Sequence, residues 1–561
     1  MTELDECDTP GRPWLAVTVI AVALAAGLGT PWFLDFDEAV YAEVSRGMLA
    51  SGDWVRPSWN GRPFYEKPAL FYWLTAAGFS VAGVTPGVPR LISLLATLGC
   101  LALIGAEARR RFSCAAAEVA VWVAGASLLP FSLGRLGLLD ALLTASLTAA
   151  LLCFCRGLEE RDAAPRRRWL ALGYLASGIA LAVKGPAFPL LIGGILLADA
   201  LLRRDLVGTL RRSGLLWGVP LLALAGAPWY VLAYLADGAT ASAALFGKHH
   251  LQRVLSPIQG HGGPLWFYLP VLALALLPFT ALLPRAIPAL RAGDEAARRF
   301  ARFCLVWAVV VVLAFSLAAT KMAQYVAPAV PALALLLGAG LAARQQRPSR
   351  VAWFLTVGAC LAFAGFVAAL PFVIERAVEL FGLRVLKTAP GLACLPPAPW
   401  PRFALLLPAA VLAGGGLAAW RAARRRGSLA AVRLLGITGA LAWAGVWISL
   451  GHLLQVTTIA PLVRLSRQAA AELPSGVPIY LLQLNHRVAP NLATGRTVEF
   501  LSARTAEDRG RVQAVLGGGA PVRLIVPAAW WEELRGSLGG RELARDCGHV
   551  LVGESPPPAR P

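Results

Sequence analysis

Long apolar segments recur along the chain and determine its predicted architecture. Each is roughly 18 to 22 residues long, enough for a helix to cross the hydrocarbon core of a bilayer. With 57% hydrophobic and 15% charged residues, the composition lies outside the range of soluble globular proteins. The pattern predicts an all-α polytopic membrane protein with about thirteen transmembrane helices. The predicted segments are residues 14–33, 87–106, 115–134, 138–157, 169–186, 186–202, 213–235, 265–284, 303–319, 323–343, 351–373, 402–420 and 430–450.

The distribution of positive charge predicts how these segments are oriented. The net charge is +20, but the arginines gather in alternate loops, which the positive-inside rule assigns to the cytoplasm. This distribution argues against a nucleic-acid partner and places the N-terminus inside. We interpret the first segment as a retained helix, because no cleavage site stands out after it. The clearest arginine clusters are Arg109–Arg111, Arg166–Arg168, Arg211 with Arg212, and Arg424–Arg426.

The first external loop, residues 34–86, is long and contains two short amphipathic helices in this prediction. The first begins at Asp37, whose carboxylate can cap the free amides of the first turn, with Tyr41 and Met48 on its apolar face. The second begins at Pro68. Helices of this kind lie along a membrane surface rather than across it. The alternative is a solvated loop with ordinary helix caps.

Three short external turns also carry polar residues within otherwise apolar sequence. These turns contain Arg135 and Asp140, then Lys184, then Lys321 with Tyr325. Ionisable groups near membrane depth are costly and usually functional. Here they gather at one face, as in an enzyme acting on a lipid headgroup, whereas a proton-coupled transporter would carry them near the midplane. A lipid-sugar flippase and a non-catalytic envelope-assembly scaffold are the competing hypotheses.

The composition changes after the last apolar segment. The strings VPIYLLQL, TVEFL and PVRLIVP predict strands, and AAWWEELRG predicts a helix. We therefore divide the chain into a transmembrane domain (1–455), a small external α/β domain (466–552) and a disordered tail (553–561).

The strings DEAVYAEVSRGMLASGDWV and FYEKPALFYWL in the first loop closely resemble bacterial lipid A aminoarabinose transferases. Those proteins belong with the protein O-mannosyltransferases among the GT-C glycosyltransferases. The resemblance implies a GT-C fold in the bacterial inner membrane, with the active site and the C-terminal domain on the periplasmic side. It also implies inverting transfer of a sugar, aminoarabinose or a related pentose or hexose, from a polyprenyl-phosphate donor. Lipid A, another glycolipid, a cell-wall polymer and a protein hydroxyl all stay open as acceptors, and we expect a monomer.

The resemblance also implies roles for acidic residues. Asp37 and Asp140 match functional aspartates of the family, and Glu38 completes the Asp-Glu pair. An ionised carboxylate can accept a proton from the acceptor. The structural alternatives are a helix cap for Asp37 and a pairing with Arg135 for Asp140.

Basic residues are the candidates for holding the donor phosphate, because lysine serves as a compact point charge for phosphate. Lys67 and Lys184 match family lysines, Lys321 and Tyr325 match a Lys-x-x-x-Tyr element, and Arg46 is a further candidate. Lysines at helix ends that merely reach the interface are the alternative.

A zinc ion is the cofactor that the resemblance implies. By position its ligands map to Glu66 and His250, although His249 and His261 stay open as alternatives. Two protein ligands leave such a site incomplete, so lipid phosphate or water would be needed as well. Interfacial histidines without a metal are the competing interpretation.

Overall fold

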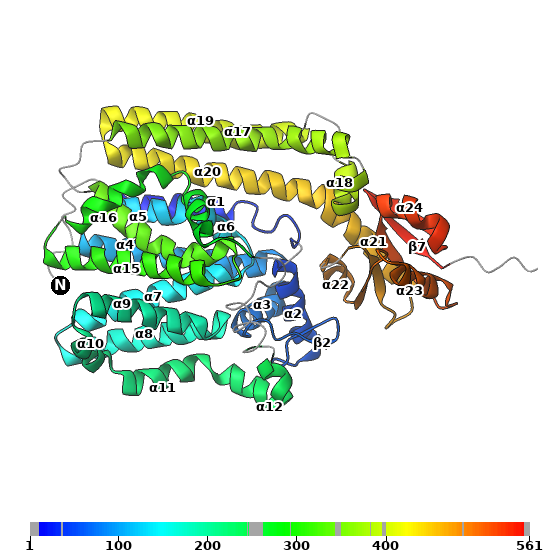
Figure 1. Ribbon diagram of the computed structural model, residues 1–561, viewed down its shortest axis with the longest axis horizontal. Coiled ribbons are helices and arrows are strands. Elements are labelled where there is room, and N and C mark those ends of the chain that lie inside the picture. Colours follow the sequence, from blue (N-terminus) through cyan, green and yellow to red (C-terminus); the bar gives the residue numbers. More distant parts are fainter. Residues whose placement is uncertain are drawn as a thin grey trace, which may run out of the picture.

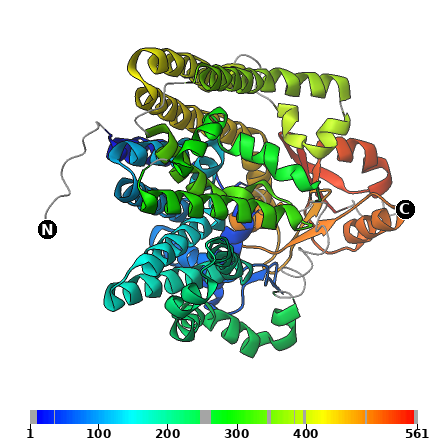
Figure 2. The same cartoon turned by 60° about the vertical axis from the view of Figure 1, so that its left-hand side comes forward.

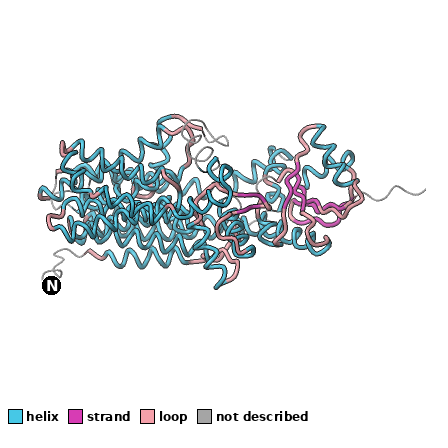
Figure 3. Tube along the Cα trace, turned by 90° about the horizontal axis from the view of Figure 1, so that it is seen from below, coloured by secondary structure: helices cyan, strands magenta, loops and turns pink. Residues whose placement is uncertain are grey.

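The helical part of the molecule and a small sheet-containing domain lie at opposite ends of an elongated shape (Figure 1). Seen from below, the longer strands are confined to the end that holds the C-terminal domain (Figure 3). The computed structural model describes residues 11–34, 37–243, 245, 262–291, 293–342, 349–381, 383–394, 400–484 and 487–554.

Helices make up nearly all of the first part of the chain. The α-helices there are α1 (Pro13–Ala25), α2 (Asp37–Ser51), α3 (Leu70–Ala82), α4 (Gly87–Arg111), α5 (Cys114–Ala126), α6 (Leu128–Arg135), α7 (Leu139–Glu159), α8 (Ala163–Lys184), α9 (Ala187–Leu202), α10 (Leu206–Ser213), α11 (Leu215–Gly226), α12 (Pro228–Ser242), α14 (Tyr268–Ala275), α15 (Glu295–Leu317), α16 (Val330–Ala342), α17 (Arg350–Phe381), α18 (Leu383–Thr388), α19 (Trp400–Arg426) and α20 (Ser428–Leu454). Shorter 3-10 or π turns are η2 (Leu265–Phe267), η3 (Thr280–Leu290), η4 (Ala323–Ala329), η5 (Pro390–Cys394) and η6 (Gln455–Ile459). Helices α17, α19 and α20 run together along one side, in yellow and yellow-green (Figures 1 and 2).

The predicted polytopic helical architecture is confirmed, but the number of spans is not. Each predicted apolar segment overlaps a helix. Within the described ranges, seven helices are long and apolar enough to cross a membrane, or up to ten if each bent pair counts as one span. The bent pairs are α5 with α6 (63°), α11 with α12 (56°), and residues 265–275 with η3 (100°). Helices α1 and α9 are apolar but shorter, so thirteen spans stays a prediction.

The first loop forms helices α2 and α3 joined by the small hairpin of β1 (Ser58–Trp59) and β2 (Arg62–Pro63). Helix α2 does not merely rest on a surface. Tyr41 and Met48 on the predicted apolar face, and Val44 beside them, are buried in the main core with residues of α3. Ala39 and Ala42 on another face are buried against the C-terminal domain. Packing on both sides therefore fixes the orientation of α2.

The C-terminal domain is an α/β unit, as predicted. It contains α21 (Ala460–Glu472), β3 (Ile479–Leu482), α22 (Ala489–Thr494), β4 (Val498–Leu501), α23 (Ala506–Gly517), β5 (Leu524–Pro527), α24 (Ala528–Leu538), β6 (Arg541–Asp546) and β7 (His549–Gly553). The sheet order is β4-β3-β5-β7-β6. Strand β3 runs parallel to β4 and β5, and β7 runs antiparallel to β5 and β6. The sequence pattern predicts β3, β4, β5 and α24 but does not reveal the β6–β7 hairpin.

In addition to the α2–α22 packing, the C-terminal domain contacts the first loop at the tip of its β1–β2 hairpin. The Asn60 side-chain oxygen, at the tip of the β1–β2 hairpin, accepts hydrogen bonds from Asn491 Nδ2 (2.6 Å) and the Val498 amide (3.0 Å). Before α2, the Trp32 amide donates at 2.7 Å to Gln455 Oε1 in η6, the turn that precedes the C-terminal domain. These bonds hold the segments before and after α2, so η6 and the C-terminal domain together brace the helix that carries Asp37.

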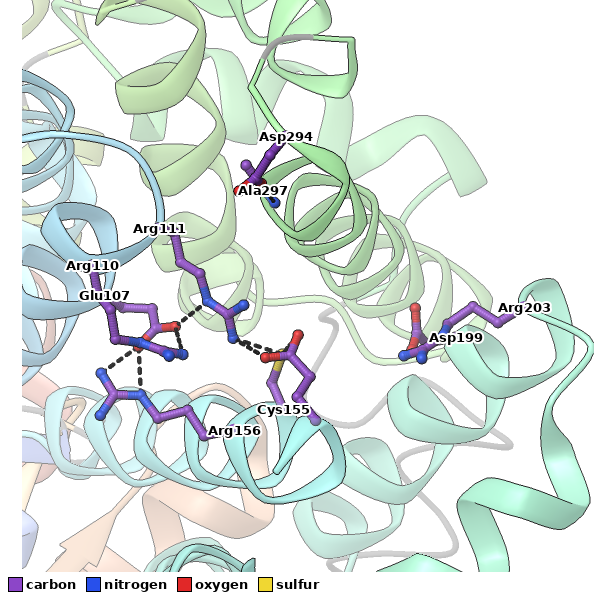
Figure 4. A network of polar contacts seen from close by, with 10 residues as sticks. Glu107, Arg110, Arg111, Cys155, Arg156, Asp199, Arg203, Asp294 and Ala297 are labelled. Carbon is purple, nitrogen blue, oxygen red and sulfur yellow. Dashed lines mark hydrogen bonds and ion pairs between the residues drawn. The ribbon is translucent and has the colours of Figure 1, made fainter. Parts of the chain in front are cut away.

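A polar network lies at the C-terminal end of α4 and connects this helix to α7 (Figure 4). The fully buried Glu107 carboxylate accepts hydrogen bonds from Arg110 (2.9 Å), Arg111 (2.7 Å) and Arg156 (2.6 Å). Arg111 also pairs with Glu159 of α7. Because Glu107 and Glu159 both have guanidinium partners, we interpret these contacts as a structural link between α4 and α7.

We expect the C-terminal domain to lose stability in mild acid. Burial lowers the pKa of His549 in β7 to about 4, so the unfolded chain binds a proton more readily than the folded domain below about pH 6.5. The contribution of His549 to the unfolding free energy should fall by about 3 kcal/mol between pH 6.5 and pH 4, and this contribution should change little below that. Hydrogen exchange of the β7 amides, corrected for intrinsic rates, measures this loss, and His549→Leu should remove it. An equal pH dependence in that variant would contradict the assignment.

Candidate active site

The first helix of the loop is anchored by a buried ion pair between α2 and α4. Glu38 and Arg90 form two hydrogen bonds of 2.8 Å each, and both side chains are 3% exposed. The same carboxylate accepts the amides of Leu34 and Gly137 at 2.8 Å. All of these contacts are structural, so the geometry gives Glu38, a predicted catalytic residue, an anchoring position.

Asp37 has the opposite environment although it is the neighbouring residue. Its side chain is exposed at the first residue of α2, which makes it the first helical residue rather than the residue before the helix. Asp37 is therefore accessible to a substrate, in contrast to Glu38.

Several of the predicted site residues converge on Tyr41. Its pKa is raised well above the usual value, first by burial and then by Asp37, Tyr72, Asp140 and Glu66. These groups come from α2, α3, α7 and the segment before α3, so the fold brings together side chains up to about a hundred positions apart. A neutral Tyr41 phenol keeps its proton and is able to donate it in a hydrogen bond.

Asp140 pairs with a lysine and not with Arg135. Lys184 Nζ at the end of α8 lies 2.5 Å from Asp140 Oδ1 in the first turn of α7, and both side chains are nearly buried. The same ammonium lies 5.1 Å from the centre of the Tyr325 ring, a cation–π distance. Arg135 instead donates to the Leu24 carbonyl at the end of α1 (2.9 Å). Three predicted site residues thus form one contiguous group.

The other two lysines differ in their surroundings. Lys321 is buried and donates to the carbonyls of Ser316 (2.7 Å) and Ala318 (2.8 Å), which end α15. These bonds use two of its three donors and hold it at a helix terminus. Lys67 is buried directly before α3 and donates to the Glu66 carbonyl at 3.3 Å.

Arg46 lies on a different face of α2 from this group. It forms a bidentate pair with Glu43 at 2.7 and 2.8 Å, which raises the pKa of Arg46. The arginine also faces Gly495 of the C-terminal domain. The structure thus places this phosphate candidate at the interdomain contact rather than beside Asp140 and Lys184.

The zinc prediction falls largely on residues outside the described part of the chain. His249, His250 and His261 all lie there, and Glu66, the other predicted ligand, is half-buried near Tyr41 and Tyr72. Among the described residues, no three His, Cys, Asp or Glu side chains are grouped to hold a metal ion. The zinc site stays a prediction.

Tyr41 and Arg90 are the site residues that sequence reasoning overlooked. Tyr41 belongs to the Asp-Glu-x-x-Tyr element, but its helical spacing indicated only an apolar face. Arg90 falls inside an apolar segment, where a lone charge is itself a signal of a buried partner.

Comparison with known families gives a consistent assignment. Residues 14–238 match the family of dolichyl-phosphate-mannose-protein mannosyltransferases. Curated relatives include the undecaprenyl phosphate-alpha-4-amino-4-deoxy-L-arabinose arabinosyl transferases of Shewanella sediminis and Pectobacterium carotovorum. The first is 31% identical over 58% of this chain and 58% of its own length. The second is 34% identical over 64% and 65%. The chain thus spans less than two thirds of these curated relatives.

Solved structures extend the comparison to nearly the whole chain. The crystal structure of ArnT from Cupriavidus metallidurans bound to undecaprenyl phosphate matches with a TM-score of 0.77 and 25% identity, over 98% of this chain and 99% of that one. An Archaeoglobus fulgidus oligosaccharyltransferase shares the fold, with a TM-score of 0.50 and 11% identity over 97% of this chain and 74% of that one. Together, the family match, the curated relatives and the solved structures confirm the predicted resemblance of this chain to the GT-C family of aminoarabinose transferase-like proteins.

Proposed function

We propose that this chain is an integral-membrane glycosyltransferase that moves a sugar from a polyprenyl-phosphate donor to an acceptor at the periplasmic face of the bacterial inner membrane. The observation that carries the proposal is the convergence of Asp37, Glu66 and Asp140 on Tyr41, with Lys184 paired to Asp140. Acidic and basic groups gathered at one end of a bundle of apolar helices suit a reaction on a lipid-linked substrate.

The proposed reaction is an inverting displacement at the anomeric carbon. An acceptor oxygen attacks this carbon while the bond to the phosphate oxygen breaks. Asp37 takes the acceptor proton, and the bonding electrons leave with the polyprenyl phosphate. Lys67 and Lys184 stabilise the charge that grows on the leaving phosphate, an interaction that strengthens in the transition state and so raises kcat. Asp140 holds the Lys184 ammonium in place.

The names of the curated relatives suggest 4-amino-4-deoxy-L-arabinose as the sugar and undecaprenyl phosphate as its carrier. We propose lipid A phosphate as the first acceptor to test, ahead of other glycolipids, cell-wall polymers and protein hydroxyls. If zinc is bound, Glu66 is the described residue that would ligate it.

Mass spectrometry of envelope lipids and glycoproteins, from cells with and without the gene, tests this function directly. Gain of an aminoarabinose mass on lipid A only when the gene is present is the expected result. Purified protein in liposomes that contain the donor lipid and lipid A should release undecaprenyl phosphate. The proposal would be overturned if the envelope lipids and glycoproteins were the same with and without the gene, and if no acceptor mixture led to release of undecaprenyl phosphate.

We expect the active site and the C-terminal domain to face the periplasm, because the arginine-rich loops mark the other side. A cysteine introduced near Gly427 should be protected from an impermeant thiol reagent in spheroplasts, and one near Gly495 should be labelled. Both readings need a background in which the natural accessible cysteines are replaced. Labelling near Gly427, or no labelling near Gly495, would contradict this predicted orientation.

A further inference from the structure

Tyr72 on α3 carries a buried hydroxyl that nothing in the described chain satisfies. The side chain is fully buried, and its oxygen has no hydrogen-bond partner among the described residues. Leaving a buried polar group unpaired costs on the order of 1–3 kcal/mol, so such groups call for a specific explanation. A stability role does not supply one, because phenylalanine would fill the same space without that cost.

The surroundings of this hydroxyl are those of the candidate active site. The pKa of Tyr72 is raised well above its usual value, first by burial and then by Glu66 and Asp37. Its ring packs against that of Tyr41, with centroids 5.8 Å apart. A phenol held neutral in this way keeps its proton and can donate it in a hydrogen bond. The unpaired donor thus lies beside two acidic groups that the proposed reaction uses.

The neighbouring charges restrict what can bind there. Two carboxylates repel an anion, so the lipid phosphate is disfavoured at this position. A sugar hydroxyl can accept from the phenol and donate to a carboxylate at the same time, and a cationic amino group is attracted to both carboxylates. Chemistry therefore favours the sugar over the phosphate as the partner of Tyr72.

We propose that Tyr72 is a substrate-contacting residue whose hydroxyl hydrogen-bonds the transferred sugar, a hydroxylated or amino-bearing ring held beside Asp37 and Glu66. The proposal rests on the proposed function, since it names the part of the donor that this side chain meets. It also explains why a buried hydroxyl is kept at a position where a hydrocarbon ring would be more stable.

Tyr72→Phe removes one oxygen atom and keeps the ring against Tyr41. We expect kcat/KM for the lipid-linked sugar to fall about 10- to 100-fold, because a site built around a hydroxyl loses a matched partner. The thermal unfolding temperature should be unchanged or higher. Thr75→Val is the matched control, since Thr75 carries another fully buried, unpaired hydroxyl one turn along α3, and its transfer rate should equal that of the wild type.

A binding measurement distinguishes failure of this proposal from failure of the proposed function. Tyr72→Phe should weaken binding of undecaprenyl phosphate-linked 4-amino-4-deoxy-L-arabinose about 10-fold or more and leave binding of undecaprenyl phosphate unchanged. This difference is measurable even if no acceptor supports transfer, which would count against the proposed function alone. Equal affinity of the variant and the wild type for the sugar-linked lipid would overturn the role of Tyr72, as would a fall in stability parallel to the loss of activity.

Discussion

Replacing Asp37 with asparagine should lower sugar transfer by about a thousandfold, within the range expected for loss of a general base. Asparagine has nearly the shape of aspartate but cannot take a proton from the acceptor. Asp37 is exposed at the start of α2, whereas the neighbouring Glu38 holds the helix in place. The variant should therefore insert and fold like the wild type. Single-turnover transfer in liposomes, alongside thermal unfolding in detergent, measures both properties.

Asp53→Asn is the matched control for this experiment. Asp53 lies on the same loop, but among the described residues its carboxylate accepts hydrogen bonds from the local amides of Val55 and Arg56, each at 2.9 Å, and pairs with the Arg56 side chain. Its loss should leave the transfer rate within about twofold, because it contacts only a surface turn. Near wild-type turnover in the Asp37 variant would show that Asp37 is not the general base and is only part of the helix N-terminus.

Much of the helical architecture followed from the length of the apolar segments, but the bends did not. Residues 115–134 read as one continuous segment, yet the chain turns by 63° between α5 and α6, where Ser127 adopts an extended conformation. A bend of this kind depends on packing against other helices, and the apolar pattern of a segment contains no information about that packing. The number of spans therefore does not follow from the apolar pattern alone.

The missed hairpin in the C-terminal domain has a different cause. Strand β7 is fully buried, but β6 is exposed and charged over residues 541–546. An exposed edge strand with charged side chains resembles a loop in sequence, although charges on an edge strand also protect it from pairing with other chains. The pairing that defines β6 comes from β7, which the local composition did not reveal.

The polar external turns predict that Asp140, Lys184 and Tyr325 gather at one face, but they do not predict which of these side chains pair. Asp140 and Lys184 are 44 positions apart, and no local pattern relates them. For Glu38, the resemblance predicted a catalytic role because it stands beside Asp37 in the motif. Its actual partner, Arg90, is 52 positions away, so only the folded chain distinguishes the anchoring acid from the exposed one.

Glu38→Gln should lower the unfolding free energy by about 3–5 kcal/mol, since it leaves the Arg90 guanidinium buried without its counter-charge. The loss is large because both side chains are nearly inaccessible and because Arg90 also holds the chain before α2 through the carbonyls of Leu28 (3.0 Å) and Pro31 (2.8 Å). Sugar transfer should fall together with stability, because the start of α2 would no longer hold Asp37 in its position. Denaturant titration of the purified protein measures the first effect.

A double variant distinguishes anchoring from catalysis at Glu38. Replacing a buried ion pair by apolar side chains of similar volume is often close to neutral, so Glu38→Met combined with Arg90→Met should be more stable than either single variant. Recovery should be partial, because the amides of Leu34 and Gly137 lose their shared acceptor. Transfer activity should recover in parallel if Glu38 only positions α2. A Glu38→Gln variant with wild-type stability and no activity would instead assign this carboxylate to the chemistry.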